Sequence, residues 1–382
     1  MAEDMAIDLS HVRVVDDHCH GILARQPVDL ASWRGIFTES PNKRLGFTVP
    51  ESPWYPRLIR GVSEILRCPP DEEAVFEARS RLVVEELTAM FLRDASIAAL
   101  LVDTGYPAPA EVMDLDRLGE AAGSPVFPIL RLETLMEDLV ATHASLREVE
   151  EALVETVAGA RDGGFVALKS IAAYRGGLEI RPRDGDEVEA AFASARIDVQ
   201  EKELVRLGHR PLLDHLLLAA LAEAARSGIP VQFHAGYGDT DVDLRLADPL
   251  HLRPILENPA LAALTVVVLH AAYPFTRQAA FLAALYEGVH LDLSYAVPFL
   301  GRTEMLDFTR SALALAPSSK LMYSSDAIFV PELHWSAAAE ARRALGTALA
   351  EMVALEELHP DGAESAGEAI LAGNARRVYS LP

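Results

Sequence analysis

Eight short apolar runs recur along this chain of 382 residues, and helical patterns separate many of them. Each run is nearly continuous in apolar residues, which is typical of parallel strands that are covered on both faces. Eight such strand–helix units predict an α/β fold, namely a TIM-like (β/α)8 barrel. The eight runs are Val12–Asp16, Ile97–Asp103, Val126–Leu132, Phe165–Ile171, Pro230–Phe233, Leu264–Leu269, Val289–Leu293 and Leu321–Ser324.

Several stretches between the runs carry helix signals. Alanine and leucine dominate Leu212–Ser227, which stops at Gly228, a residue that commonly follows the end of a helix. Pro274–Tyr286 opens with a proline, as the first turn of a helix tolerates. Pro331–Leu358 is a long stretch rich in alanine, glutamate and arginine. We expect these three stretches to be helices on the outside of the barrel.

Two regions exceed what a minimal barrel needs. Residues 34–95 contain several prolines and helical patterns such as Glu73–Arg93, so they predict a mainly helical insertion after the first strand. Residues 176–211 are polar and charged, which predicts a loop followed by a helix. We therefore expect residues 1–382 to form a single barrel domain with one helical insertion.

The chain is strongly acidic, with a formal net charge of −23 and a pI of about 4.9. Such a surface repels nucleic acids and anionic lipids, so we expect a small-molecule substrate and neither a nucleic acid nor a membrane as partner. Two cysteines exclude a disulfide framework. No signal peptide or membrane span is visible, which favours the cytoplasm. A homo-oligomer remains compatible with these features.

Two histidines, His18 and His20, stand one residue apart just after the first run. Side chains two residues apart in a strand point to the same face, so both imidazoles can aim at one metal ion. They can equally cap the strand or pack in the core. The His-x-His pair alone does not decide between these interpretations.

Later runs also end in polar residues. The fourth contains Lys169, and His234, His270 and Asp326 follow the fifth, sixth and eighth. The carboxyl ends of barrel strands share one mouth, where active sites lie. Imidazoles and a carboxylate suit zinc, which lowers the pKa of a bound water, and an aspartate beside that water can accept its proton. Lys169 fits such a site as a carbamylated bridging ligand, or as an ammonium group that holds a substrate carboxylate.

These motifs resemble those of the amidohydrolase superfamily. The stretches at 168–178, 233–253, 269–275 and 323–327 are similar to the amidohydrolase-2 subgroup, and so is the C-terminal stretch 371–379. In particular, they are similar to the hydrolase half of proteins that fuse this barrel to glutamine synthetase, the fungal FluG and plant nodulin type. The similarity extends from residue 12 to about 380 and is loose over the insertion.

The resemblance implies one divalent metal ion, Zn²⁺ in the first place, with room for a second. Its implied ligands are His18, His20, His234 and Asp326. Asp326 and His270 are the implied catalytic residues, the first as a proton carrier and the second by polarising the scissile carbonyl. His270 would alternatively bind a second metal, together with Lys169 if that side chain is carbamylated.

Four residues are candidates for binding the substrate: Tyr174, Arg175, Tyr237 and Arg245. Tyr174 and Arg175 follow the fourth strand, where an arginine can clamp a substrate carboxylate. A surface ion pair is the alternative for Arg175, and a solvated turn is the alternative for the loop that contains Arg245.

Other polar residues close to these motifs carry plainer expectations. We expect Cys19 to be buried in packing, and Glu332 and His334 to belong to an ordinary helix start. Arg131 and Glu133, at the end of the third strand, can pair at the barrel mouth and support Lys169.

We expect a metal-dependent hydrolase that cleaves a C–N bond of the amide type in a small molecule. A γ-glutamyl amide is suggested only by the relatives fused to glutamine synthetase. The alternative within the same subgroup is a metal-dependent decarboxylase, and a non-catalytic barrel is the third hypothesis. Because every expected ligand position is filled, the non-catalytic interpretation is the least favoured.

Overall fold

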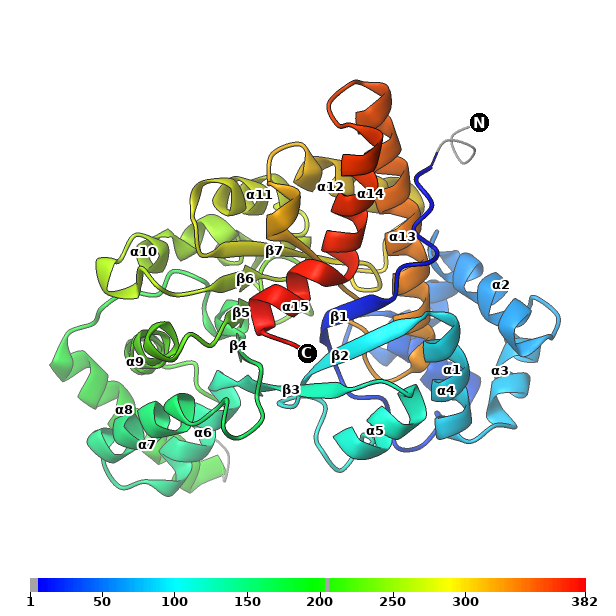
Figure 1. Ribbon diagram of the computed structural model, residues 1–382. Coiled ribbons are helices and arrows are strands. Elements are labelled where there is room, and N and C mark those ends of the chain that lie inside the picture. Colours follow the sequence, from blue (N-terminus) through cyan, green and yellow to red (C-terminus); the bar gives the residue numbers. More distant parts are fainter. Residues whose placement is uncertain (1–5, 203–205) are drawn as a thin grey trace. The chain divides into compact units, whose positions relative to one another are not determined.

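The computed structural model describes residues 6–202 and 206–382. Its eight strands form one sheet in chain order, and helices connect them, so the predicted TIM-like α/β fold is confirmed (Figure 1). Strand pairs such as β1–β2 and β4–β5 are parallel. The strands are β1 Val14–Cys19, β2 Ile97–Asp103, β3 Val126–Arg131, β4 Ala167–Ser170, β5 Val231–Phe233, β6 Val266–Val268, β7 Val289–Ser294 and β8 Leu321–Ser324.

The first strand differs most from its predicted bounds. It ends at Cys19 instead of Asp16, so His18 lies inside β1 and His20 directly follows it. The prediction ended the strand at its first polar residues, but Asp16, Asp17 and His18 are all buried at 0% exposure. Hydrogen bonds inside the protein satisfy such groups, which allows a strand to continue through them. β2 and β8 match their predicted bounds, and the other strands differ by one or two residues.

The insertion after β1 is mainly helical, as predicted. Its α-helices are α1 Leu30–Arg34, α2 Tyr55–Leu66, α3 Glu72–Ser80 and α4 Val84–Asp94. The pattern expected over Glu73–Arg93 is two helices and not one, because α3 ends before residues 81–83 and α4 begins after them. The side chain of Asp71 caps α3 by accepting a hydrogen bond from the backbone of Ala74 at 2.9 Å.

Aromatic packing and one buried ion pair hold the insertion in place. Trp33 is fully buried, with its ring 5.1 Å from that of Phe37. The guanidinium of Arg79 lies 5.3 Å from the ring centre of Trp33 and pairs with Glu332 at 2.7 Å. Both charged groups of this pair are buried, so removing either partner would leave an uncompensated charge. Because Glu332 lies in the first turn of α13, the pair ties the insertion to the segment after β8.

The remaining helices largely follow the predicted pattern. The expected helices at 212–227 and 331–358 are α9 and α13, and α9 ends at Gly228, whose φ is +69°. The helix expected from Pro274 is α11, which begins two residues later. The α-helices that follow the insertion are α5 Leu115–Ala122, α6 Leu132–Thr142, α7 Leu146–Ala158, α8 Gly185–Lys202, α9 Arg210–Ser227, α10 Arg253–Leu256, α11 Thr276–Leu285, α12 Arg302–Leu313, α13 Pro331–Ala354, α14 Pro360–Glu368 and α15 Asn374–Tyr379.

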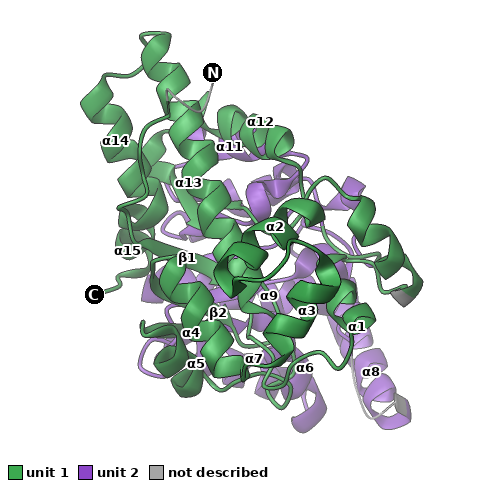
Figure 2. Ribbon diagram, turned by 90° about the vertical axis from the view of Figure 1, so that its right-hand side faces the viewer, with its two compact units in different colours: residues 1–127, 238–240, 292–382 green, residues 128–237, 241–291 purple. Residues whose placement is uncertain are grey.

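The chain divides into two compact units, coloured separately in Figure 2. Unit 1 comprises residues 1–127, 238–240 and 292–382, and unit 2 comprises residues 128–237 and 241–291. The boundaries cut the chain within β3 and β7. The single domain expected over residues 1–382 stays a prediction. Among the described residues, no helix is both long and apolar enough to cross a membrane.

Candidate metal centre

Unit 1 brings together three of the predicted ligands. The Nε2 atoms of His18 and His20 lie 3.6 and 3.5 Å from Oδ1 of Asp326. The two imidazole rings are edge to face with centroids 5.2 Å apart. All three residues are buried, with exposures of 0%, 9% and 9%. We call this group the donor group, because each side chain offers one atom suited to a metal ion.

The tautomer of His20 is set by a backbone carbonyl. Its Nδ1 lies 2.8 Å from the carbonyl oxygen of Tyr106. Since a carbonyl only accepts hydrogen bonds, Nδ1 carries a proton and donates it, which leaves Nε2 as the ring atom that can bind a metal. A histidine that donates its other ring N–H to a carbonyl is the usual arrangement of a metal ligand.

Backbone hydrogen bonds align the segments that carry the donor group. The amide of Asp326 donates to the carbonyl of His18 at 3.0 Å, and the amide of His20 donates to Ala327 at 2.8 Å. Asp326 takes a left-handed φ of +51°, which only a few per cent of non-glycine residues adopt. The chain after β8 therefore turns sharply while it remains bonded to the end of β1.

The donor group fits a divalent metal. Zinc binds nitrogen and oxygen at about 2.0–2.2 Å, so two tetrahedral ligands of one ion lie about 3.4 Å apart. The two N–O separations here are 3.5 and 3.6 Å. Two imidazoles and one carboxylate also form a donor set found in catalytic zinc sites. The residues present would thus hold the ion that the sequence predicts.

Unit 2 holds a second group of predicted site residues. His234 follows β5, and His270 opens the short 3-10 helix η8 His270–Ala272 after β6. The ring of His234 lies 4.5 Å from that of His270 and 4.5 Å from that of Tyr174. Both histidines are buried. We call these three residues the aromatic group.

The loops that carry His234 and His270 contain left-handed residues and are closely packed. His270 has a φ of +62°, in the left-handed region. Gly236 also has a positive φ, and a Cβ atom at this position would meet the carbonyl oxygen of Tyr273 at 2.2 Å. The backbone of Tyr237 donates to that same oxygen at 2.7 Å. Only glycine permits this approach of the β5 and β6 loops.

Lys169 is buried at 2% exposure in the middle of β4, between Arg131 of β3 and Gln232 of β5. Glu133 lies in α6, and its carboxylate accepts hydrogen bonds from Ser170 Oγ at 2.7 Å and Ile171 N at 2.9 Å. Burial raises the pKa of Glu133, and these hydrogen bonds oppose the rise. Glu133 thus stabilises the end of β4, next to Lys169, through hydrogen bonds from Ser170 and Ile171. The sequence analysis did not identify these two residues.

The two candidate arginines are each bound to a carboxylate. Arg175, in η4 Ala172–Arg175, pairs with Glu137 at 3.2 Å, and both side chains are largely buried. Arg245 pairs with Asp243 at 2.6 Å, and its side chain is 87% exposed. The sequence analysis gave two interpretations for Arg175, a contact with the substrate and a surface ion pair. Contact of either arginine with a substrate stays a prediction.

One acidic residue near the donor group was missed by the sequence analysis. Burial, followed by the charges of Asp326 and Asp239, raises the pKa of Glu39 to about 7. Glu39 belongs to the insertion, far from any strand end, so the strand-end rule had no means of finding it. Its perturbed pKa marks it as a further group of chemical interest.

Unit 1 contains a cavity of about 230 Å³ whose lining includes Gly21, the residue after His20, and Tyr106, whose carbonyl binds His20. Gly21, Val102, Pro107, Val112 and Met113 give it mainly apolar walls, and Asp103, Thr104 and Tyr106 also line it. Drug-sized ligands occupy about 300–1,000 Å³. The cavity can therefore hold one compact part of a small molecule.

The eight-stranded barrel carries histidine and aspartate side chains at the ends of its strands, and these are donor types that catalytic zinc sites use. A sequence model with the description Amidohydrolase matches residues 126–381, about two thirds of the chain. The chain belongs to this family, the amidohydrolase-2 family that its motifs resemble.

Three similar proteins illustrate the relationship. Protein fluG of Emericella nidulans is 31% identical over 227 residues, which are 58% of this chain and only 26% of that protein. A crystal structure from Lactobacillus casei, provisionally assigned as a metal-dependent hydrolase, is 28% identical, with a TM-score of 0.88 over 98% of both chains. Uronate isomerase of Thermotoga maritima, at 11% identity, has a TM-score of 0.68 over 99% of both chains and shares the fold.

Proposed function

We propose that this protein is a metal-dependent hydrolase that cleaves a C–N bond of the amide type in a small molecule. The observation that carries the proposal is the donor group, in which His18, His20 and Asp326 offer three buried atoms at separations suited to zinc. Membership of the amidohydrolase-2 family and the similarity to the Lactobacillus casei protein support it.

We assign the metal to His18, His20 and Asp326, with His234 as the fourth protein ligand. One Zn²⁺ is the form proposed, and a second ion would call on His270 and a carbamylated Lys169. When bound, the ion would act as a Lewis acid and would lower the pKa of a water molecule toward about 7. Support for His234 comes from its position directly after β5, since strand ends carry the ligands in this type of barrel.

The protein residues then divide the remaining work. Asp326 accepts the proton of the attacking water and passes it to the leaving nitrogen. His270 donates a hydrogen bond to the carbonyl oxygen, where negative charge develops. The Tyr106 carbonyl keeps the proton of His20 on Nδ1, so Nε2 stays available as a ligand. Tyr174, Arg175, Tyr237 and Arg245 are the residues proposed to contact the rest of the substrate.

The substrate class is narrowed by the cavity lined by Gly21 and Tyr106. Its mainly apolar walls and volume of about 230 Å³ suit a branched alkyl group or a single aromatic ring of the substrate. A γ-glutamyl amide is the first head group to test, because the motifs resemble barrels that are fused to glutamine synthetase. Amides of glutamate with small apolar amines combine both features.

The test is a substrate panel run on protein of known metal content. Zinc-loaded protein is expected to release amine from γ-glutamyl amides, and the His18→Ala and His20→Ala variants are expected to lose both metal and activity. Activity that survives complete removal of the metal would overturn the proposal.

A decarboxylase is the second candidate, and the aromatic group favours it. Tyr174 packs 4.5 Å from His234 and could stack on a planar substrate. Aromatic carboxylates are therefore added to the panel, with carbon dioxide and amine measured in parallel. Release of carbon dioxide without amine would assign the protein to the lyases.

A further inference from the structure

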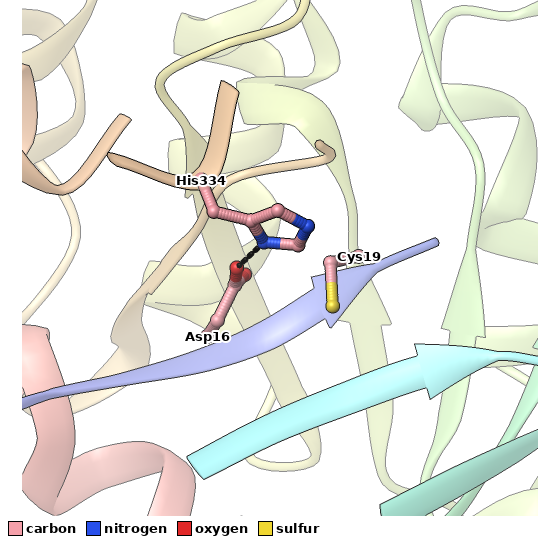
Figure 3. A group of neighbouring side chains, drawn as sticks. All are labelled: Asp16, Cys19 and His334. Atoms are coloured by element: carbon pink, nitrogen blue, oxygen red, sulfur yellow. Dashed lines mark hydrogen bonds and ion pairs between the residues drawn. The ribbon is translucent and has the colours of Figure 1, made fainter. Parts of the chain in front are cut away.

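A second buried polar cluster adjoins the donor group within unit 1. It consists of Asp16 in β1, Ser325 directly after β8, and His334 in the first turns of α13, all at 0% exposure. Ser325 donates to Asp16 twice, from its backbone N to Oδ1 at 2.7 Å and from Oγ to Oδ2 at 2.5 Å. His334 Nδ1 lies 3.2 Å from Oδ2 of Asp16. Figure 3 shows the two side chains pointing toward each other. One carboxylate thus joins three separate elements.

The cluster is bonded into the turn that carries Asp326. Ser325 immediately precedes Asp326, and its Oγ accepts a hydrogen bond from the amide of Ala327 at 2.9 Å. Ser325, on one side of Asp326, is therefore held by Asp16, and Ala327, on the other side, is held by Ser325. A left-handed backbone such as that of Asp326 costs about 1–2 kcal/mol, so surrounding contacts must maintain it.

Asp16 also belongs to the strand that carries the two histidine ligands. It lies two residues before His18 in β1. The hydrogen bonds from Ser325 therefore set the register between β1 and the turn after β8, in parallel with the backbone bond from Asp326 to His18 at 3.0 Å. His334 adds a donor from α13, because a carboxylate only accepts and Nδ1 must supply the proton.

The same cluster could be taken for a second metal site. Asp16, Cys19 and His334 each offer an atom, and these atoms lie within 4.8 Å of one another. Two observations argue against it. Cys19 Sγ donates to the carbonyl of Leu101 at 3.4 Å, and Asp16 already accepts the bonds from Ser325 and His334.

We propose that Asp16, Ser325 and His334 are positioning residues that hold the carboxylate of Asp326 against His18 and His20. This inference rests on the metal site of the proposed function, but not on the reaction. The three residues touch neither the metal nor the substrate. They act by fixing the left-handed turn, so that the donor atoms stand ready at the separations that zinc requires.

The test compares two adjacent serines. Ser325→Ala removes one hydroxyl that binds Asp16 and the Ala327 amide. Ser324→Ala is the matched control, because Ser324 is also fully buried but its Oγ pairs with Ser294 Oγ at 2.7 Å. The full chain is freed of metal, its thermal unfolding is recorded, and its zinc affinity is measured by competition with a chromophoric chelator. Residues that orient metal ligands typically change the affinity 10–100-fold.

Ser325→Ala is expected to weaken zinc binding about 10–100-fold, and Ser324→Ala to leave it within about twofold of wild type. Ser325→Ala should lower the unfolding temperature of the metal-free chain more than Ser324→Ala does, because it loses two buried hydrogen bonds and Ser324→Ala loses one. Asp16→Asn is expected to weaken zinc binding at least as much, and the double variant no further, because both residues act on the same turn. If Asp16→Asn does not fold, the serine pair decides alone.

Equal zinc affinities of the two serine variants would overturn the proposal. So would a second equivalent of zinc that disappears in Cys19→Ser, since that would make the cluster a metal site, or a wild-type chain that binds no zinc. A chain that binds zinc and shows the expected serine difference, yet hydrolyses no amide, would break the proposed function and leave the positioning role standing.

Discussion

The donor group of unit 1 and the aromatic group of unit 2 place histidines by different means. His18 lies inside a strand and His20 directly after it, and hydrogen bonds to the turn after β8 hold both. His234 and His270 lie in loops whose backbone is left-handed at His270 and glycine-dependent at Gly236. A strand fixes a side chain through its ladder, whereas such loops depend on local packing. We infer that the side chains of the donor group are positioned by strand hydrogen bonding, and those of the aromatic group by the packing of their own loops.

Loss of a histidine from the donor group should have the largest effect. His18→Ala removes a fully buried ligand from the strand, and zinc affinity is expected to fall by more than about 100-fold, with activity lost in parallel. Zinc content after dialysis, measured by atomic emission, checks this. Full zinc occupancy in the variant would remove the distinction drawn between the two groups.

The corresponding change in the aromatic group should separate binding from catalysis. His270→Asn is expected to keep one equivalent of zinc and to reduce kcat about 10²–10³-fold, because a donor to the developing oxyanion is lost. Zinc content and steady-state kinetics on the same preparation provide the measurement. If His270→Asn binds half as much zinc as the wild-type protein, the site holds two metal ions and the one-metal proposal is wrong.

The loops of unit 2 should be sensitive to one methyl group. Gly236→Ala combines a φ of +75° with a Cβ that would meet the Tyr273 carbonyl oxygen at 2.2 Å. Stability is expected to fall by about 2–4 kcal/mol, which urea unfolding measures. Gly185→Ala is the control, because a Cβ there meets no atom within 4 Å. Equal stabilities of the two variants would show that the loops adapt.

The smallest effect concerns the acidic residue near the donor group. The pKa of Glu39 is raised from 4.5 to about 7, so the folded chain keeps a proton that the unfolded chain releases. The stability of metal-free wild type should therefore decline as pH rises from about 4.5 to 7, by at most about 3 kcal/mol. In Glu39→Gln this part of the decline is absent.

Urea unfolding of metal-free wild type and Glu39→Gln at pH 5 and pH 8 measures that difference. Glu148→Gln is the control, because hydrogen bonds from the backbone of Ser145 lower the pKa of Glu148. Its carboxylate is ionised in the folded and the unfolded chain at both pH values, so this variant should keep the pH dependence of wild type. If the stabilities of wild type and Glu39→Gln depend on pH in the same way, the pKa of Glu39 is not raised and its carboxyl group is in contact with water.

The sequence alone determined the fold and the positions of its ligand candidates along the chain. Parallel strands buried on both faces produce uninterrupted apolar runs, so β2 and β8 were predicted to the residue. The end of β1 was wrong, because apolar content cannot reveal that Asp16 and Asp17 are satisfied inside the protein. Asp16 receives its hydrogen bonds from Ser325 and His334, more than 300 residues later.

Only the tertiary structure decided which side chains meet. It brought Asp326 to His18 and His20, assigned the His20 proton through the Tyr106 carbonyl, and raised the pKa of Glu39 in the insertion. Each of these depends on distances between residues that are far apart in the chain. The local sequence pattern predicts which residues form a strand or a helix. Burial and hydrogen bonds between distant residues arise only when the strands have assembled, so the local pattern cannot predict them.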